Sequence, residues 1–267
     1  MGGANVGADV TIAIERVEDG RVLALTLNRP KANVLTISMM NDLRQALAGA
    51  HDDAPLRMVL LRGAGGSFSY GAAIAEHRRD SAPVMLAALH ALVRDIASYP
   101  VPVVAMVEGK CLGGAFELVL GCHVVLATPS ATFACPEVKL GAVPPVLAVI
   151  GHLRLGAPIA ERMVVTGCEL TAARAEQLGL VASLVPAGTD PRTFALEWYR
   201  ANLAPLSALA LREATHAARA GSGMLSALAA PLNAAERRYR ERVLPSRDAS
   251  EGIEAFLAKR APRWVDA

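Results

Sequence analysis

Two glycine-rich turns are the segments of this sequence best suited to chemistry. The first runs Ser67-Phe-Ser-Tyr-Gly71-Ala-Ala-Ile74, and the second runs Gly109-Lys-Cys-Leu-Gly113-Gly114-Ala-Phe-Glu117. Each follows an apolar stretch typical of a strand and leads into a predicted helix, where free backbone N–H groups favour negative charge. If the turns lie side by side, the N–H groups of Ala72 and Gly114 would form an oxyanion hole. The glycines could equally do no more than permit tight turns.

Two glutamates stand in otherwise apolar sequence and could act as an acid and a base. Glu117 is predicted in the first turn of the helix that follows the second glycine turn, and Glu137 follows a proline in Phe133-Ala-Cys-Pro-Glu-Val138. General acid–base chemistry uses such a pair when one carboxyl is ionised and the other protonated. Each could instead be a structural acid, because a helix dipole stabilises a carboxylate in the first turn by ~0.5 kcal/mol.

The composition and the remaining polar residues argue against several other classes of protein. The 267 residues carry a net charge of +2 and only 19% charged side chains, which is unlike a disordered chain and provides no basic surface for nucleic acid. The histidines show no metal-binding spacing, the serines of the first turn lack a G-x-S-x-G motif, and neither turn fits a nucleotide-binding pattern. We therefore expect no metal site and no nucleic-acid partner.

The cysteines and the apolar segments bear on the compartment. Cys111, Cys122, Cys135 and Cys168 are widely spaced, which favours buried thiols in a reducing environment over disulfides or a zinc site. The N-terminus has no signal-peptide pattern, and the longest apolar run, residues 140–151, is too short to cross a bilayer. The expectation is a cytoplasmic protein with no membrane partner.

Hydrophobic periodicity predicts the elements that must position the two turns. Alternating residues over 9–27, interrupted by Glu18-Asp19-Gly20, predict a hairpin. Strands are expected at 57–62, 101–107 and 123–127, and helices from residue 37 to an end near residues 51–53, over 85–96 and over 115–120. Past Pro145 helices predominate, at 158–165, 171–178, 194–201, 206–218, 225–241 and 249–259. This order predicts an α/β core over residues 1–204 and a C-terminal helical region over 205–267.

The motifs, taken together, resemble the crotonase, or enoyl-CoA hydratase/isomerase, superfamily over nearly the whole chain. The similarity lies in the two glycine turns, in Leu27-Asn-Arg-Pro-Lys-Ala-Asn-Val-Leu35, in Pro136-Glu-Val-Lys-Leu-Gly141 and in Glu251-Gly-Ile-Glu-Ala-Phe-Leu-Ala-Lys-Arg260. The resemblance implies a crotonase-like spiral of ββα units with a C-terminal α-helical trimerisation region that builds a homotrimer or a dimer of trimers. It also implies an acyl-CoA thioester substrate, so coenzyme A is part of the substrate and no separate cofactor is expected.

The resemblance also implies roles for individual residues. The N–H groups of Ala72 and Gly114 would hold the thioester oxygen, while Glu117 and Glu137 would activate a water and deliver a proton to carbon. Lys31 and Ala32 would bind the nucleotide end of coenzyme A, and Phe256 and Lys259 would reach the coenzyme A of a neighbouring subunit. The further residues implied in binding the substrate are Gly71, Ala73, Ile74, Gly113 and Pro144.

The chain departs from the family pattern near the site. Ala73 stands where the pattern Gly-Ala-Asp has its aspartate, and His123 stands where Cys-Asp has its aspartate. Pro144-Pro145 replaces a glycine stretch, which exchanges a flexible turn for a rigid one and is expected to reshape the acyl pocket. The Asn-Arg-Pro segment is one residue shorter than in many hydratases, so its coenzyme A contacts transfer less directly.

Three segments are similar to cyclohexa-1,5-diene-1-carbonyl-CoA hydratases, which act in the anaerobic breakdown of aromatic acids. These segments are residues 71–77, 110–112 and 137–145. Because both glutamates are present, we expect a hydro-lyase that adds water to a conjugated enoyl-CoA or dienoyl-CoA. The alternatives are a short-chain trans-2-enoyl-CoA hydratase of fatty acid metabolism, an enoyl-CoA isomerase with one glutamate as a proton shuttle, and a non-catalytic acyl-CoA-binding subunit.

Overall fold

The computed structural model describes residues 11–267 and is built around two sheets. The larger sheet has the strand order β1-β2-β3-β4-β6-β9, and the smaller has the order β5-β7-β8. Apart from the antiparallel pair β1–β2, neighbouring strands of the larger sheet are parallel. The strands are β1 (Ile12–Val17), β2 (Val22–Leu27), β3 (Met58–Gly63), β4 (Val103–Val107), β5 (Lys110–Leu112), β6 (Val124–Ala127), β7 (Thr132–Ala134), β8 (Leu170–Thr171) and β9 (Ser183–Leu184).

The expected N-terminal hairpin is confirmed. Glu18, Asp19 and Gly20 adopt left-handed backbone angles (φ of 54°, 54° and 81°) between β1 and β2, which short polar residues and glycine tolerate best. The hairpin places buried β2 against β3. Parallel pairing of β3, β4 and β6 then brings the loops that follow these strands to one edge of the sheet.

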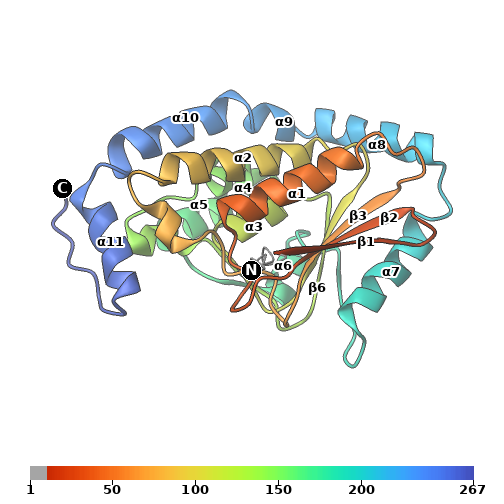
Figure 1. Cartoon of the computed structure of the whole chain (residues 1–267), viewed down its shortest axis with the longest axis horizontal. Helices are drawn as coiled ribbons and strands as arrows, with labels where there is room; N and C mark the ends of the chain where they lie inside the picture. Colours follow the sequence, from red (N-terminus) through yellow and green to blue (C-terminus); the bar gives the residue numbers. More distant parts are fainter. Residues whose placement is uncertain (1–10) are drawn as a thin grey trace, which may run out of the picture.

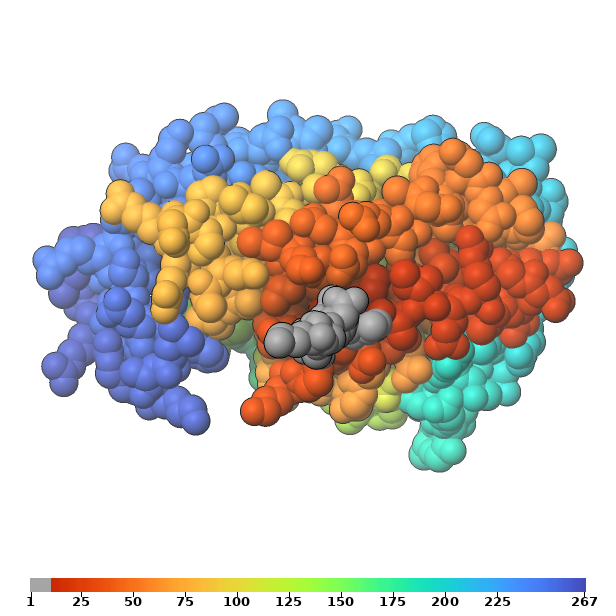
Figure 2. All heavy atoms as spheres, in the orientation of Figure 1, coloured from red at the N-terminus to blue at the C-terminus, as the bar shows by residue number. Residues whose placement is uncertain are grey.

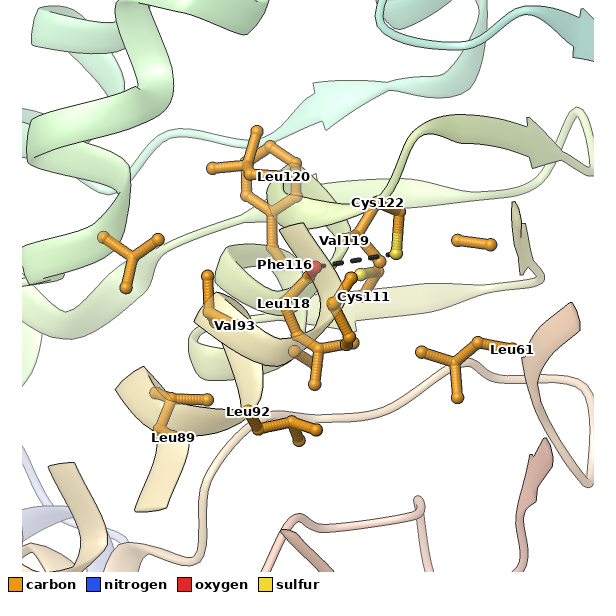
Figure 3. Close-up of a cluster of buried hydrophobic side chains, with 14 of the residues drawn as sticks. Leu61, Leu89, Leu92, Val93, Cys111, Phe116, Leu118, Val119, Leu120 and Cys122 are labelled. Atoms are coloured by element: carbon orange, nitrogen blue, oxygen red, sulfur yellow. Dashed lines mark hydrogen bonds between the residues drawn. The ribbon is translucent and has the colours of Figure 1, made fainter. Parts of the chain in front are cut away.

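Four helices supply most of the remaining core. These are α1 (Ile37–Gly49), α2 (Ala82–Ala97), α3 (Gly114–Gly121) and α4 (Pro145–Leu155), and α2 contacts both α1 and α3. In Figure 3 Leu89, Leu92 and Val93 of α2 point toward the side chains of α3. The predicted stripe Met85, Leu89, Leu92 and Ile96 is buried, so it belongs to the core as expected.

The C-terminal helices lie along one side and one end of the molecule. Figure 1 shows α8, α9 and α10 running above α1 and α2, with α11 at the far end. In the space-filling view the last residues, in dark blue, form a lobe beside the start of α2 (Figure 2). The helices that follow α4 in the chain are α5 (Ala157–Thr166), α6 (Ala172–Gln177), α7 (Pro191–Asn202), α8 (Ala208–Gly221), α9 (Met224–Ala227), α10 (Ala230–Arg238) and α11 (Arg247–Leu257).

Some local expectations are wrong. The single helix predicted over 225–241 is three elements, α9, α10 and the π-helical turn η3 (Tyr239–Val243), because Pro231 begins a new helix and cannot continue the preceding one. Helix α4 starts at the prolines that were expected to form a turn. The short strands β5, β7, β8 and β9 were missed, since two or three residues carry no periodicity.

The structure also bears on membrane spans, metal ligands and cysteines. Within residues 11–267 no helix is long and apolar enough to span a membrane, and no group of three potential metal ligands occurs. All four cysteines are free thiols, three of them buried and Cys168 half-buried. The division at residue 204 and the trimeric assembly stay predictions.

Candidate active site

The two glycine turns lie side by side, as the sequence predicts. The amide of Phe68 donates to the Glu108 carbonyl (2.7 Å), and Ser69 both donates to Lys110 (3.0 Å) and accepts from Leu112 (3.0 Å). These bonds join the loop after β3 to β5 in a short parallel ladder. At its end Gly71 has a φ of 94°, and a Cβ there would lie 2.7 Å from the Leu112 carbonyl oxygen. Only glycine permits this close approach.

The backbone N–H groups of Ala72 and Gly114 are available for a ligand. A Cβ built on Gly114 would lie 3.6 Å from the Ala72 Cβ, so the two residues are neighbours. Leu35 pairs with the residues on either side of Ala72, which turns the Ala72 N–H away from that strand. The hydrogen bonds found within residues 11–267 leave both N–H groups without an acceptor. Two such adjacent donors match the geometry of an oxyanion hole.

The first turn does not open a long helix, contrary to expectation. It leads into η1 (Ile74–His77), a single 3-10 turn that precedes α2. The N–H of Ala72 therefore lies beside a short turn and is oriented by the Leu35 pairing. Gly114 does begin a helix, α3, and Gly113 precedes it with a φ of 53°.

Glu117 is held by the start of a second helix. Its side chain is only 2% exposed, and its Oε1 accepts hydrogen bonds from the backbone N–H groups of Val146 (2.7 Å) and Leu147 (3.0 Å). These groups belong to the first turn of α4, where amides have no acceptor within the helix. Pro144 and Pro145 fix the backbone just ahead of them, so the two prolines aim these donors at Glu117.

Glu137 lies above the second glycine turn. It is in η2 (Pro136–Leu140), a 3-10 turn that follows β7. A Cβ on Gly113 would lie 2.8 Å from Glu137 Oε1, so the carboxyl group sits directly over the residue next to Gly114. Its Oε2 is buried and has no hydrogen-bond partner within the described chain. The carboxyl group is therefore free to act on a ligand.

The electrostatic environments of the two carboxyl groups differ. Burial raises the pKa of Glu117, although the two backbone N–H groups partly offset this by stabilising its ionised form. Burial also raises the pKa of Glu137, and the nearby Glu117 charge raises it further. The pair therefore loses its two protons in separate steps. Glu117 ionises first because it keeps two N–H donors, and Glu137 retains the proton.

The other predicted binding residues divide into three groups. Gly71, Ala73 and Ile74 are neighbours of Ala72 in the chain, Gly113 lies beside Glu137 Oε1, and buried Pro144 lies two residues before the Val146 amide that donates to Glu117. Lys31 and Ala32 have left-handed backbones and line a separate surface cleft of about 590 Å³ with Tyr70. Phe256, 53% exposed, and Lys259 lie at the end of α11, which contacts η1 and η2 of its own chain. Their reach into a neighbouring subunit stays a prediction.

Sequence reasoning missed the roles of Asn33 and Tyr239. The buried Asn33 side chain accepts from the Arg29 amide and donates to the carbonyl oxygens of Ala64 and Ser67, which holds the cleft loop against the first glycine turn. The sequence feature that could have indicated this role is the asparagine itself, because asparagine tolerates the positive φ of 49° found at this position. Burial, and then the Glu137 charge, raise the pKa of Tyr239 to about 12, so the Glu137 charge acts on the Tyr239 hydroxyl. Tyr239 is about 100 residues from Glu137 in sequence, and nothing local signals this interaction.

Comparison with known proteins agrees with this geometry. The model of the family described as "Enoyl-CoA hydratase/isomerase" matches residues 18–267. The chain belongs to this family. The expected crotonase-like α/β fold and hydratase-type hydro-lyase class are thereby confirmed.

Individual members of the family cover nearly all of the chain. It is 39% identical to the cyclohexa-1,5-dienecarbonyl-CoA hydratase of Thauera aromatica, over 92% of this chain and 93% of that one. It is 35% identical to the 2,3-dehydroadipyl-CoA hydratase of Escherichia coli, over 91% and 94% of the two chains. The crystal structure of an enoyl-CoA hydratase from Mycobacterium avium subsp. paratuberculosis K-10 superposes with a TM-score of 0.83 at 30% identity, covering 96% and 99%.

Proposed function

We propose that this enzyme adds water to a conjugated dienoyl-CoA or enoyl-CoA thioester, with cyclohexa-1,5-diene-1-carbonyl-CoA as its substrate. The observation that carries the proposal is the meeting of two unlike carboxyl groups with two free N–H groups. Glu117 is held by backbone donors, and Glu137 has an unpaired buried oxygen. Ala72 and Gly114 are adjacent to each other. General acid–base chemistry next to a polarised carbonyl requires these parts.

Each part of the site has one role in the reaction. The thioester oxygen accepts hydrogen bonds from Ala72 and Gly114, which draws electron density from the conjugated double bond. The Glu117 carboxylate takes a proton from a water as its oxygen bonds to the β-carbon, and the π electrons move onto the thioester as an enolate. Glu137 gives its proton to the α-carbon, which restores the carbonyl. The pair still holds one proton, now on Glu117, and proton exchange with solvent moves it back to Glu137 for the next turnover.

The coenzyme A portion would occupy the cleft beside the site. Lys31 and Ala32 line it, and the Tyr70 amide donates to the Ala32 carbonyl (3.0 Å), which ties the cleft to the first glycine turn. Lys31 is exposed and suits a phosphate as a point charge. Coenzyme A enters as part of the substrate, and the reaction above requires no further cofactor.

The cyclic substrate is supported by two features. Pro144 and Pro145 form a rigid wall where the family pattern has glycines, and they start the helix that holds Glu117. A rigid cyclic acyl group needs less loop movement than a flexible chain, so a fixed wall suits it. The similarity to the Thauera aromatica hydratase, at 39% identity, points to the same substrate.

The deciding experiment mixes purified protein with cyclohexa-1,5-diene-1-carbonyl-CoA and, separately, with crotonyl-CoA. Mass spectrometry follows the gain of one water in each mixture. Water gained by the cyclic diene alone is the expected result. Hydration of crotonyl-CoA alone would overturn the cyclic substrate while keeping the hydratase, and no hydration of either would overturn both.

Two variants separate a hydratase from an isomerase or a binding subunit. Glu117→Gln and Glu137→Gln should each abolish hydration, because water activation and proton delivery need different carboxyl groups. Double-bond migration that survives in one of them would identify a one-glutamate proton shuttle. Tight binding of the thioester without turnover by the wild-type protein would indicate the binding subunit.

The assembly belongs to the same proposal. We propose a homotrimer or a dimer of trimers in which the exposed end of α11, with Phe256 and Lys259, meets a neighbouring subunit. Sedimentation equilibrium of the full chain should give three or six times the mass of one subunit. A monomer at micromolar concentration would contradict this assignment.

A further inference from the structure

Three buried hydrogen-bond donors lie at or just past the C-terminal ends of α3, α4 and α8, away from the active site. They are Nε2 of His123, Nε of Arg154 and Nε of Arg219. Each of these nitrogen atoms is inaccessible to solvent and has no hydrogen-bond partner within residues 11–267. A buried polar group without a partner destabilises the fold by roughly 1–3 kcal/mol, so three at one place call for an acceptor.

Helix ends and one strand bring these side chains together. Arg219 lies in the last turn of α8, is 6% exposed, and donates from Nη2 to the carbonyl oxygen of Gly121 (2.7 Å), the last residue of α3. Arg154 lies in the last turn of α4. His123 follows Gly121 by two residues, at the start of β6. Both Arg154 and His123 are partly exposed, so the cluster is open to solvent on one side.

All three unpaired atoms are donors. The Val103 amide donates to Nδ1 of His123 (3.1 Å), which makes Nδ1 the acceptor and leaves the hydrogen of the neutral ring on Nε2. The guanidinium nitrogens have hydrogens and no lone pair to share. A second donor cannot satisfy such a set. Each of the three needs an acceptor oxygen, and a group with several such oxygens could serve more than one of them.

The cluster also lacks a negative charge. No carboxylate within residues 11–267 lies within 4.0 Å of either arginine. Burial, followed by the charges of Arg219 and Arg154, lowers the pKa of His123 to about 3. Burial, followed by the charge of Arg154, lowers the pKa of Arg219 to about 10. The C-terminal ends of α3, α4 and α8 each supply only about half a negative charge. These partial charges belong to the helices themselves and are not a carboxylate that could pair with an arginine.

From this arrangement we infer that His123, Arg154 and Arg219 form a binding site for a small oxoanion, a free phosphate or carboxylate. The anion would provide the acceptor oxygens and the negative charge that the cluster lacks. Position 123 is where the family pattern has an aspartate and this chain has a histidine.

The site is separate from the catalytic carboxyl groups but shares two helices with them. Glu117 lies in the first turn of α3 and accepts from the first turn of α4, whereas the cluster lies at the other ends of both helices. Glu117 is four residues from Gly121 along α3, and Val146 is eight residues from Arg154 along α4, so at 1.5 Å of rise per residue the two sites are roughly 6–12 Å apart along the helix axes. A bound anion would join the ends of α3, α4 and α8.

The test measures thermal unfolding of the full chain in increasing phosphate, with chloride replaced so that ionic strength stays constant. The melting temperature should rise in a saturable way, by roughly 3 °C when phosphate reaches ten times its dissociation constant. His123→Asp supplies a carboxylate within the chain, so it should fold and lose most of this rise. Arg154→Met should also lose it. Arg44→Met is the matched control, because Arg44 already pairs with Asp95 (2.6 Å), and it should keep the full rise.

The remaining measurements distinguish the sources of the anion. Acetate in place of phosphate tests whether a carboxylate suffices, and a crystal soaked in selenate should show an anomalous peak within hydrogen-bond distance of Arg154 and Arg219. A melting temperature that does not respond to either anion would overturn the inference. So would an equal response in His123→Asp. Sedimentation in the same buffers would reveal an acidic side chain of a second copy in the site, since assembly would then block the phosphate effect and refute a free anion as the ligand.

Discussion

Replacing Glu117 with glutamine should abolish hydration and at the same time stabilise the fold at neutral and alkaline pH. Glutamine has nearly the shape of the glutamate, and its amide oxygen can accept from Val146 and Leu147 as Oε1 does at 2.7 and 3.0 Å. The helix cap is therefore kept. What is removed is a negative charge in a side chain that is only 2% exposed.

The size of the stabilisation follows from the pKa of Glu117. Burial raises this pKa from its ordinary value of 4.5 to about 7, against the opposing effect of the two backbone N–H groups. One pKa unit corresponds to 1.36 kcal/mol, so keeping the group ionised in the folded protein costs ~3 kcal/mol. Since the folded state binds the proton more tightly than the unfolded state, this part of the stability is present below pH 4.5 and is lost as the pH rises through about 7.

The assay compares unfolding of the wild type and Glu117→Gln by denaturant at pH 5 and pH 8. Glutamine imitates the protonated carboxyl, so we expect the variant to be ~3 kcal/mol more stable than the wild type at pH 8 and only ~1 kcal/mol more stable at pH 5. Hydration should fall at least ~100-fold. Glu161→Gln, in an exposed position on α5, is the control and should change neither quantity. A Glu117→Gln variant that is less stable at pH 8, or that keeps its activity, would refute the reasoning.

Three further predictions concern the same site. Gly113→Ala would place a Cβ 2.8 Å from Glu137 Oε1 at a φ of 53°, so kcat should fall at least tenfold and stability should fall by ~1–3 kcal/mol. Gly20→Ala is the control: with a φ of 81° and no atom within 4 Å, it should lose stability and keep its kcat. The pH profile of kcat/KM should be bell-shaped, rising well above pH 4.5 as Glu117 ionises and falling as Glu137 loses its proton, and a flat profile between pH 5 and 9 would contradict the two roles. Lys31→Ala should raise KM for the thioester about three- to tenfold and leave kcat within twofold, because it removes a contact far from the reacting carbons; steady-state kinetics would show whether kcat falls instead.

The parts of the site that could be predicted from sequence are those fixed by local chain geometry. Gly113, Gly114 and Glu117 lie within five residues, so a strand followed by a glycine turn and a helix places the glutamate near the free N–H of Gly114. The strands that bring the first turn beside the second are apolar and regular enough to be recognised. Their parallel order then makes the two loops neighbours, as the ladder at Ser69 shows.

The contacts that set the chemistry could not be predicted, because they join distant segments. Glu117 meets the amides of Val146 and Leu147 about 30 residues away. The prolines before them suggest a rigid turn as readily as the first turn of α4. The Glu137 charge acts on Tyr239, which lies in a π-helical turn that follows an unforeseen break in the C-terminal helices. Hydrophobic periodicity predicts which face of a helix is buried, but it does not predict which other segment of the chain packs against that face.

The active site depends on two features that sequence patterns describe poorly: the burial of Glu117 and the N–H groups of α4 that bond to it. Without the N–H groups of α4, burial alone would keep Glu117 protonated near neutral pH, and it could not take a proton from water. With a more exposed Glu117, solvent would screen its charge, and the pKa of Glu137 would be raised by burial with a smaller contribution from Glu117. The rigid start of α4 at Pro144 and Pro145 therefore tunes both carboxyl groups at once. Substituting these prolines with glycine should change the pH profile as well as the choice of acyl group, whereas a purely steric wall would affect the acyl group alone.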